Sequence, residues 1–195
     1  RCEGEAVAAS PRMSELRFWT VMPAAGSSTR MHADIPKQYL SLAGRTVIEW
    51  ALAPFLARSD CRGIVVALAR DDIRWAQLSV AREARIRTTV GGGERAESVL
   101  AGLRALAGDA AESDWVLVHD AARPCLSDTD LQRLIDTLRD DEVGGLLAAP
   151  LVDTLKRADA VGRVQQTVPR ESLWRALTPQ MFRLGALQRA LTNVT

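Results

Sequence analysis

Residues 18–31 read Phe-Trp-Thr-Val-Met-Pro-Ala-Ala-Gly-Ser-Ser-Thr-Arg-Met, and Pro-Lys-Gln-Tyr-Leu follows at residues 36–40. The apolar run Phe18–Met22 predicts a buried strand. It leads into small residues, which let backbone N–H groups approach a ligand, and then to the cations Arg30 and Lys37. Such cations can hold a triphosphate and stabilise charge on the phosphorus under attack. The stretch therefore predicts a nucleotide site directly after a strand.

The loop after this strand matches neither of two common phosphate-binding patterns. It lacks the GxxxxGK[ST] sequence of the Walker loop and the GxGxxG sequence of dinucleotide-binding proteins. Taken alone, Ala24, Ala25 and Gly26 fit a tight strand-to-helix turn better than a ligand site. Because Arg30 and Lys37 accompany them, we favour the nucleotide site.

Apolar and amphipathic stretches alternate along the rest of the chain, as is typical of an α/β fold with a mostly parallel sheet flanked by helices. The expected strands are Phe18–Met22, Gly63–Ala69, Ile86–Val90, Trp115–His119 and Leu146–Ala149. Apolar residues at helical spacing predict helices over 47–56, 96–106 and 131–138. Open α/β sheets bind ligands at the carboxyl ends of their strands. We therefore expect the site among segments 23–37, 91–98, 119–124 and 150–156.

The pattern changes after Pro150. Residues 155–157 and 163–168 flank a turn at Ala160-Val161-Gly162, which predicts a projecting β-hairpin. Such a hairpin has little apolar face of its own and is marginally stable alone. We expect it to pack on another surface, such as a second copy of the chain.

The totals restrict the class of protein. A chain of 195 residues with 47% hydrophobic content fits one sizeable domain. We assign that domain to residues 13–195 and regard residues 1–12, which lack periodicity, as a flexible extension. A net charge of +1 gives no reason to expect binding to nucleic acid or to a membrane surface, and no apolar run is long enough for a membrane span.

Cysteine and histidine usage gives no sign of a metal cluster. Cys2, Cys61 and Cys125 lack CxxC spacing, so we expect neither a disulfide framework nor a zinc site, and a reducing cytoplasm fits best. His32 and His119 have no metal-ligand partner at suitable spacing. We expect His119 to pack or hydrogen-bond at the end of a strand.

Two further segments could contact a nucleotide. The glycine loop at 91–93 precedes a helix and Ser98, so a base or ribose could lie against its backbone; a flexible connector is an equal alternative. Asp120 follows a buried strand, where a lone carboxylate is more often a cap. Beside phosphates it would be a natural Mg²⁺ ligand.

Several segments in order resemble the 2-C-methyl-D-erythritol 4-phosphate cytidylyltransferase family. They are PAAGSSTRM, PKQYL, GGGERAESVLAGL, VLVHDAARP, APLVDTLK and ALTPQMF. The resemblance runs from about Trp19 to the end of the chain. It implies a Rossmann-like domain of the nucleotide-diphospho-sugar transferase type, and a homodimer joined through a β-arm near residues 152–175.

The resemblance also implies a reaction. In that family the 4-phosphate of methylerythritol phosphate attacks the α-phosphorus of CTP, with Mg²⁺ bridging phosphates. The products are 4-diphosphocytidyl-2-C-methyl-D-erythritol, in the non-mevalonate route to isoprenoids, and pyrophosphate.

Site residues carry over motif by motif. Arg30, Lys37 and Arg170 would be catalytic, the first two by stabilising the transition state. The CTP site would be lined by Ala24, Ala25, Gly26, Gly92, Ser98 and Ala121. The methylerythritol phosphate would contact Asp120, Arg123, Thr154, Arg170 and Thr178, with Thr154 and Arg170 supplied by the partner's arm.

This sequence departs from the family at two points. Gly93 stands where an acidic residue is common, and the family continues past Thr195 with a segment whose lysine helps to hold the substrate phosphate. One alternative function is a cytidylyltransferase for another polyol phosphate, such as ribitol 5-phosphate. Another is a nucleotide-binding module without catalysis, against which Arg30 and Lys37 argue because binding alone does not require transition-state cations.

Overall fold

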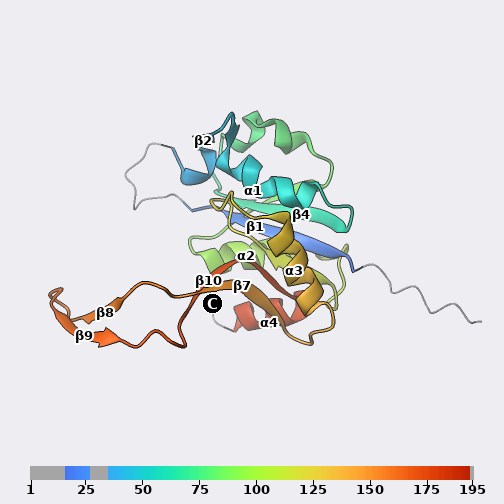
Figure 1. The fold of residues 1–195 in the computed structure, drawn as a ribbon. Helices are drawn as coiled ribbons and strands as arrows, with labels where there is room; N and C mark the ends of the chain where they lie inside the picture. Colours follow the sequence, from blue (N-terminus) through green and yellow to red (C-terminus); the bar gives the residue numbers. More distant parts are fainter. Residues whose placement is uncertain (1–15, 27–34, 194–195) are drawn as a thin grey trace, which may run out of the picture.

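The computed structural model describes residues 16–26 and 35–193 and contains a six-stranded sheet with the order β5-β4-β1-β6-β10-β7 (Figure 1). Its strands are β1 (Phe18–Ala24), β4 (Cys61–Leu68), β5 (Ile86–Val90), β6 (Trp115–Val118), β7 (Gly144–Pro150) and β10 (Trp174–Arg183). β1 pairs in parallel with β4 and β6, and β4 with β5, whereas β10 runs antiparallel to β6 and β7. The sheet is mostly parallel, and the expected α/β class is confirmed.

Helices cover both faces of this sheet. They are α1 (Val47–Leu56), α2 (Arg95–Arg104), α3 (Asp128–Leu138) and α4 (Leu184–Thr192). α1 and α3 share one apolar core, and α2 and α4 share the other. Alternate side chains of a strand point to opposite faces, so β1 gives Phe18 and Met22 to the first core and Val21 to the second. Among the described residues, no helix is long and apolar enough to cross a bilayer.

The helix starts are fixed by caps beside the strand ends. α2 and α3 begin slightly earlier than their apolar stripes indicate. The Ser127 hydroxyl accepts the Asp130 N–H at 3.1 Å, and the Glu97 carboxylate accepts the Glu94 N–H at 3.1 Å. Shorter elements complete the body: η2 (Lys37–Tyr39), β2 (Ser41–Leu42), β3 (Arg45–Thr46), η3 (Trp75–Gln77) and η4 (Ser79–Arg82).

Strand β10 and helix α4 are not predicted from the sequence. Pro179 lies within β10, and a proline has no N–H to give to a strand ladder. The structure accommodates it in a bulge. Ala176 pairs with Ala148, and the next pair joins Gln180 to Leu146, so the residues between the two pairs on β10 outnumber those on β7.

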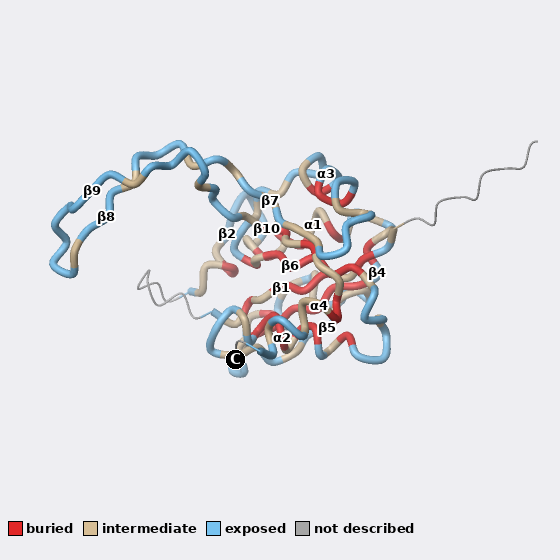
Figure 2. Tube along the Cα trace, turned by 90° about the horizontal axis from the view of Figure 1, so that it is seen from below, coloured by how far each residue is buried: buried red, intermediate tan, exposed pale blue. Residues whose placement is uncertain are grey.

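Strands β8 (Leu155–Ala158) and β9 (Val164–Val168) form a separate two-stranded antiparallel sheet, here called the arm. It is inserted between β7 and β10 and projects from the body (Figure 1), and Figure 2 shows it almost wholly exposed. Gly162 closes its turn with a φ of +82°, a conformation that favours glycine. The role of the arm in dimerisation stays a prediction.

Candidate active site

A cavity of about 390 Å³ opens at the carboxyl ends of β1 and β6 and the start of α2. The segments 23–37, 91–98 and 119–124 all contribute to it, as the sequence predicts. The predicted residues that line it are Ala24, Ala25, Gly26, Lys37, Gly92, Ser98, Asp120 and Ala121. Segment 150–156 contributes nothing to this lining.

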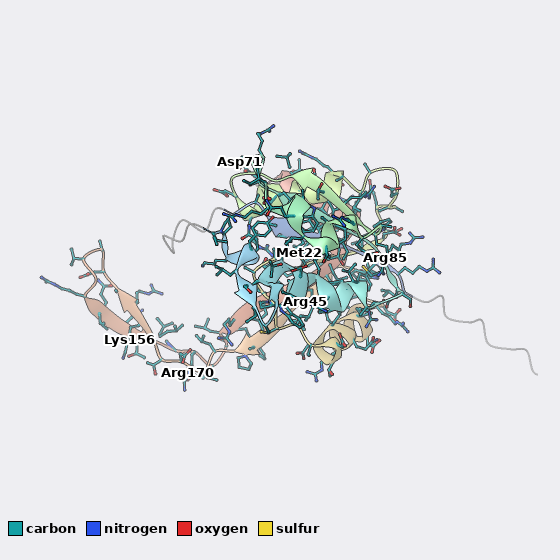
Figure 3. The ribbon with its side chains drawn as sticks, turned by 90° about the horizontal axis from the view of Figure 1, so that it is seen from above. Met22, Arg45, Asp71, Arg85, Lys156 and Arg170 are labelled. Carbon is teal, nitrogen blue, oxygen red and sulfur yellow. The ribbon has the colours of Figure 1, made fainter. Side chains whose placement is uncertain are left out.

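Three predicted residues are not described at this cavity. Arg30 falls outside the described residues. Thr154 and Arg170 are exposed at the base of the arm, where Arg170 donates to the Val152 carbonyl. In Figure 3, Arg170 lies near Lys156 on the projecting arm, well away from Met22 inside the sheet. One chain therefore does not bring Thr154 and Arg170 to its own cavity.

The glycine loop at 91–93 lies against Ala25, in the stretch of small residues at 24–26. A Cβ on Gly91 would lie 2.6 Å from the Ala25 Cβ and 2.8 Å from the Ser98 Oγ. The Ser98 hydroxyl is buried and accepts the Gly92 N–H at 3.1 Å. Glycine is thus required at Gly91 by close approach rather than by a positive φ, and Ser98 holds the shape of the loop.

The Gln38 side chain anchors the other wall. It is buried, and its Nε2 donates to the Ala24 carbonyl at 2.8 Å. The next residue, Tyr39, donates its hydroxyl to Asp72 at 2.6 Å, and burial together with that bond raises the pKa of Tyr39 far above its ordinary value. The segment that carries Lys37 is therefore fixed to the end of β1.

Asp120 lies between two arginines at the cavity edge. Arg95 Nε donates to one carboxylate oxygen at 2.8 Å, and Arg123 Nε donates to the other at 3.0 Å. Arg95 also reaches Gln180 at 3.5 Å. Arg123 thus lies beside the cavity through its ion pair with Asp120.

The surroundings of Asp120 do not fit the predicted Mg²⁺ ligand. Both of its oxygens accept hydrogen bonds from guanidinium groups, which repel a divalent cation. Within residues 16–26 and 35–193, no three His, Cys, Asp or Glu side chains gather where they could hold a metal ion. The surroundings of Asp120 therefore favour its ion pairs with Arg95 and Arg123 over a bound Mg²⁺.

His119 is buried beneath this edge, as the sequence predicts for a packing or hydrogen-bonding residue. Its ring lies 5.3 Å from that of Phe55, centroid to centroid. Its nitrogens lie 3.0 Å from the Arg123 carbonyl and 3.0 Å from the Thr178 hydroxyl. Burial lowers the pKa of His119 to about 4, so the ring is neutral at pH 7.

Comparison with known proteins identifies the family. The sequence model of the family described as 2-C-methyl-D-erythritol 4-phosphate cytidylyltransferase matches residues 18–195. The chain belongs to this family. A methylerythritol phosphate cytidylyltransferase from Ectopseudomonas mendocina is 62% identical over 176 residues, which cover 90% of this chain and 75% of that protein. One from Pseudomonas aeruginosa is 59% identical over 177 residues, covering 90% and 76%.

Solved structures of methylerythritol phosphate cytidylyltransferases have the same fold. A crystal structure of 4-diphosphocytidyl-2C-methyl-D-erythritol synthase matches with a TM-score of 0.79 at 38% identity, covering 91% of this chain and 79% of the other. The Francisella tularensis cytidylyltransferase gives 0.77 at 32% identity, covering 91% and 77%. The expected Rossmann-like arrangement is therefore confirmed.

In this member of the methylerythritol phosphate cytidylyltransferase family, sequence reasoning missed three polar side chains at the site: Arg95, Gln180 and Gln38. Arg95 is the first residue of α2, just after the glycine loop. The positive end of the helix dipole disfavours a cation at this position. That position could have marked it as a partner for an acidic group. Gln180 lies on β10 beside the predicted Thr178, but its contact with Arg95 has no signal in the sequence.

Proposed function

We propose that this chain transfers CMP from CTP to 2-C-methyl-D-erythritol 4-phosphate, giving 4-diphosphocytidyl-2-C-methyl-D-erythritol and pyrophosphate in isoprenoid biosynthesis. Family membership over residues 18–195 carries the proposal. The cavity supports it, because small residues, a glycine loop and Lys37 converge at the carboxyl ends of the strands.

In this proposal, CTP lies against the backbone of Ala24, Ala25, Gly26, Gly92 and Ala121 and beside Ser98. The substrate phosphate oxygen attacks the α-phosphorus, the new P–O bond forms, and the bond to the β-phosphate oxygen breaks to release pyrophosphate. Lys37 and Arg30 stabilise the negative charge that develops at phosphorus. Mg²⁺ would arrive with the phosphates and neutralise part of their charge.

We further propose that the acceptor binds near Asp120, Arg123 and Thr178, and that the arm of a second chain supplies Thr154 and Arg170. The exposure of Thr154 and Arg170 and their distance from their own cavity support this arrangement. Exposed apolar side chains on and beside the arm also favour a docking partner, namely Val152, Val161, Val164 and Trp174. A single domain over residues 13–195 and a cytoplasmic location stay predictions.

The activity is tested by pyrophosphate release from CTP and Mg²⁺ with either methylerythritol 4-phosphate or ribitol 5-phosphate. We expect release with methylerythritol phosphate and little competition by ribitol phosphate. A preference for ribitol phosphate would move the chain to another polyol phosphate, and no release with CTP and either acceptor would favour a nucleotide-binding module. The assay should include a version extended beyond Thr195, because the chain spans about three quarters of its relatives' length.

The shared site is tested by mixing two inactive variants, Lys37→Ala and Arg170→Ala. If Arg170 acts across subunits, each mixed dimer has one cavity with both residues intact. Random mixing should then restore roughly a quarter of wild-type activity. If Arg170 acts within its own chain, no mixed dimer has an intact site, and activity stays at the level of the separate variants.

A further inference from the structure

The turn 120–123 is held at both ends by one buried side chain. Arg123 N–H donates to the Asp120 carbonyl at 3.0 Å and closes the turn. His119 Nε2 lies 3.0 Å from the Arg123 carbonyl at one end. At the other end, the Asp120 N–H donates to the Thr178 hydroxyl at 3.3 Å, and that hydroxyl lies 3.0 Å from His119 Nδ1. His119 therefore connects both ends, directly and through Thr178.

The direction of each hydrogen bond follows from the chemistry of its partners. A carbonyl oxygen only accepts, so His119 Nε2 must be protonated and must donate its N–H to the Arg123 carbonyl. In a neutral imidazole the other nitrogen then has a lone pair. His119 Nδ1 therefore accepts, and the Thr178 hydroxyl must donate to it. The Thr178 oxygen keeps its lone pairs for the Asp120 N–H.

The surroundings of His119 favour the neutral ring. The residue is 1% exposed, with the Phe55 ring against it, and burial lowers its pKa to about 4. The charged groups that face it, Asp120 and Arg123, have opposite signs and already pair with each other at 3.0 Å. The backbone of Arg123 and of Thr178 acts in the other direction and raises the pKa of the ring, but the loss of hydration on burial is the larger effect.

The bulge in β10 gives Thr178 its place in this network. The ladder to β7 is interrupted between Ala176 and Gln180, and pairing with β6 begins only where Gln180 meets Val118. Thr178 is thereby freed from regular pairing beside His119, the residue that follows β6. Bulges next to active sites commonly redirect a side chain in this way.

We propose that His119 is a positioning residue whose tautomer fixes the direction of the Thr178 hydroxyl, so that Thr178 orders the Asp120 turn and donates no hydrogen bond to the substrate phosphate. The role of the turn in acceptor binding rests on the proposed function, whereas the direction of the hydrogen bonds does not. Thr178 contributes to the reaction through Asp120, and its hydroxyl proton is committed to His119.

The tautomer can be measured without any activity. Two-bond proton–nitrogen correlation spectra of the full chain with ¹⁵N-histidine at pH 7.5 distinguish the two neutral tautomers and the charged ring. The sequence has two histidines, so His32→Gln assigns the signals. We expect His119 to be protonated at Nε2 and bare at Nδ1. A proton on Nδ1, alone or in a charged ring, overturns the proposal whether or not the chain proves to be a cytidylyltransferase.

The positioning role is tested by a double-mutant cycle on kcat/KM for the acceptor. His119→Gln keeps a donor for Arg123 and loses the acceptor for Thr178, while Thr178→Val removes the hydroxyl. We expect about a tenfold loss from each variant and about the same loss from both together, because they break one network. Multiplied losses would mean that Thr178 acts on substrate independently, and would overturn the proposal.

Matched variants separate a positioning role from loss of structure. Thr178→Ser keeps the hydroxyl and should restore most of the activity. His119→Asn places its amide oxygen near the former Nδ1 and should retain the Thr178 bond better than His119→Gln. Equal activity of Thr178→Ser and Thr178→Val, in variants with unchanged melting temperatures, would count against the proposal.

Discussion

The central sheet and the arm are both hydrogen-bonded β-structure, but they differ in what surrounds their strands. In β6, Val116 and Leu117 are fully buried, whereas Val161 and Val164 of the arm are 76% and 64% exposed. The sheet is stabilised by its own two apolar cores. The arm has no comparable interior, and a two-stranded sheet without further packing is only marginally stable. Substitutions in these regions should therefore have separable effects on folding and on function.

The largest expected effect comes from removing core volume. Leu117→Ala should lower the free energy of unfolding by about 2–5 kcal/mol, because a fully buried side chain leaves a cavity. Val161→Ala in the arm should stay within about 0.5 kcal/mol of wild type. Urea unfolding of the two variants measures the contrast, and similar losses would mean that the arm folds as part of the body.

A second test separates chemistry from folding within the body. Lys37→Met should lower kcat by on the order of 10²–10³-fold, because in the proposed reaction it removes a cation whose contact strengthens in the transition state. The melting temperature and CTP affinity should change much less. Arg133→Met, an equivalent loss of charge on the exposed surface of α3, is the control and should leave turnover unchanged. Equal losses of affinity and turnover would exclude this role for Lys37.

A third test measures how acid changes the free energy of unfolding of the body. Burial lowers the pKa of His119 from 6.5 to about 4. Between these two pH values, the histidine is protonated in the unfolded chain and neutral in the folded chain. Stability present above pH 6.5 should be lost as the pH falls towards 4, by about 3 kcal/mol in total. Urea unfolding at several pH values gives this slope. His119→Gln should remove that part of it, and an unchanged slope would rule out His119 as the cause.

The smallest contrast concerns two glycines. A Cβ on Gly102 would lie 2.4 Å from Val21 Cγ1 between α2 and β1, so Gly102→Ala should cost about 1 kcal/mol after the gain in helix propensity. Gly162→Ala strains only the arm turn, where φ is +82°. It should leave global unfolding unchanged while increasing amide exchange in the arm. A decrease in the global free energy of unfolding caused by Gly162→Ala would mean that the arm unfolds together with the body.

The sequence predicted the fold best where local pattern and environment agree. β5 was predicted with its observed limits, because its mostly β-branched residues end directly at the glycine loop 91–93. β7 begins at Gly144, earlier than predicted. The two glycines at its start were not assigned to a strand because glycine is rare in strands. β10 was missed because a proline such as Pro179 is unfavourable inside a strand. The bulge that accommodates Pro179 is visible only in the pairing of β10 with β7.

The site was predictable to the extent that its residues follow strand ends. Lys37, Ser98 and Asp120 were found in this way, and the structure brings them to one cavity. Arg95 and Gln180 reach the site because α2 and β10 converge there, which is a long-range contact. Of the two, only Arg95 has a local signal, its position at a helix N-terminus. The tautomer of His119 likewise depends on partners from separate segments.

The separation between cavity and arm has a practical consequence for chemical labelling. The sequence contains two lysines, Lys37 in the wall of the cavity and Lys156 on the exposed face of β8. Amine-reactive reagents therefore address these positions and the terminal amine, and peptide mass spectrometry can quantify each one. Protection of Lys37 would report an occupied cavity, and protection of Lys156 a covered arm. One labelling reaction thus reports separately on the cavity and on the arm, in a protein that carries no substitutions.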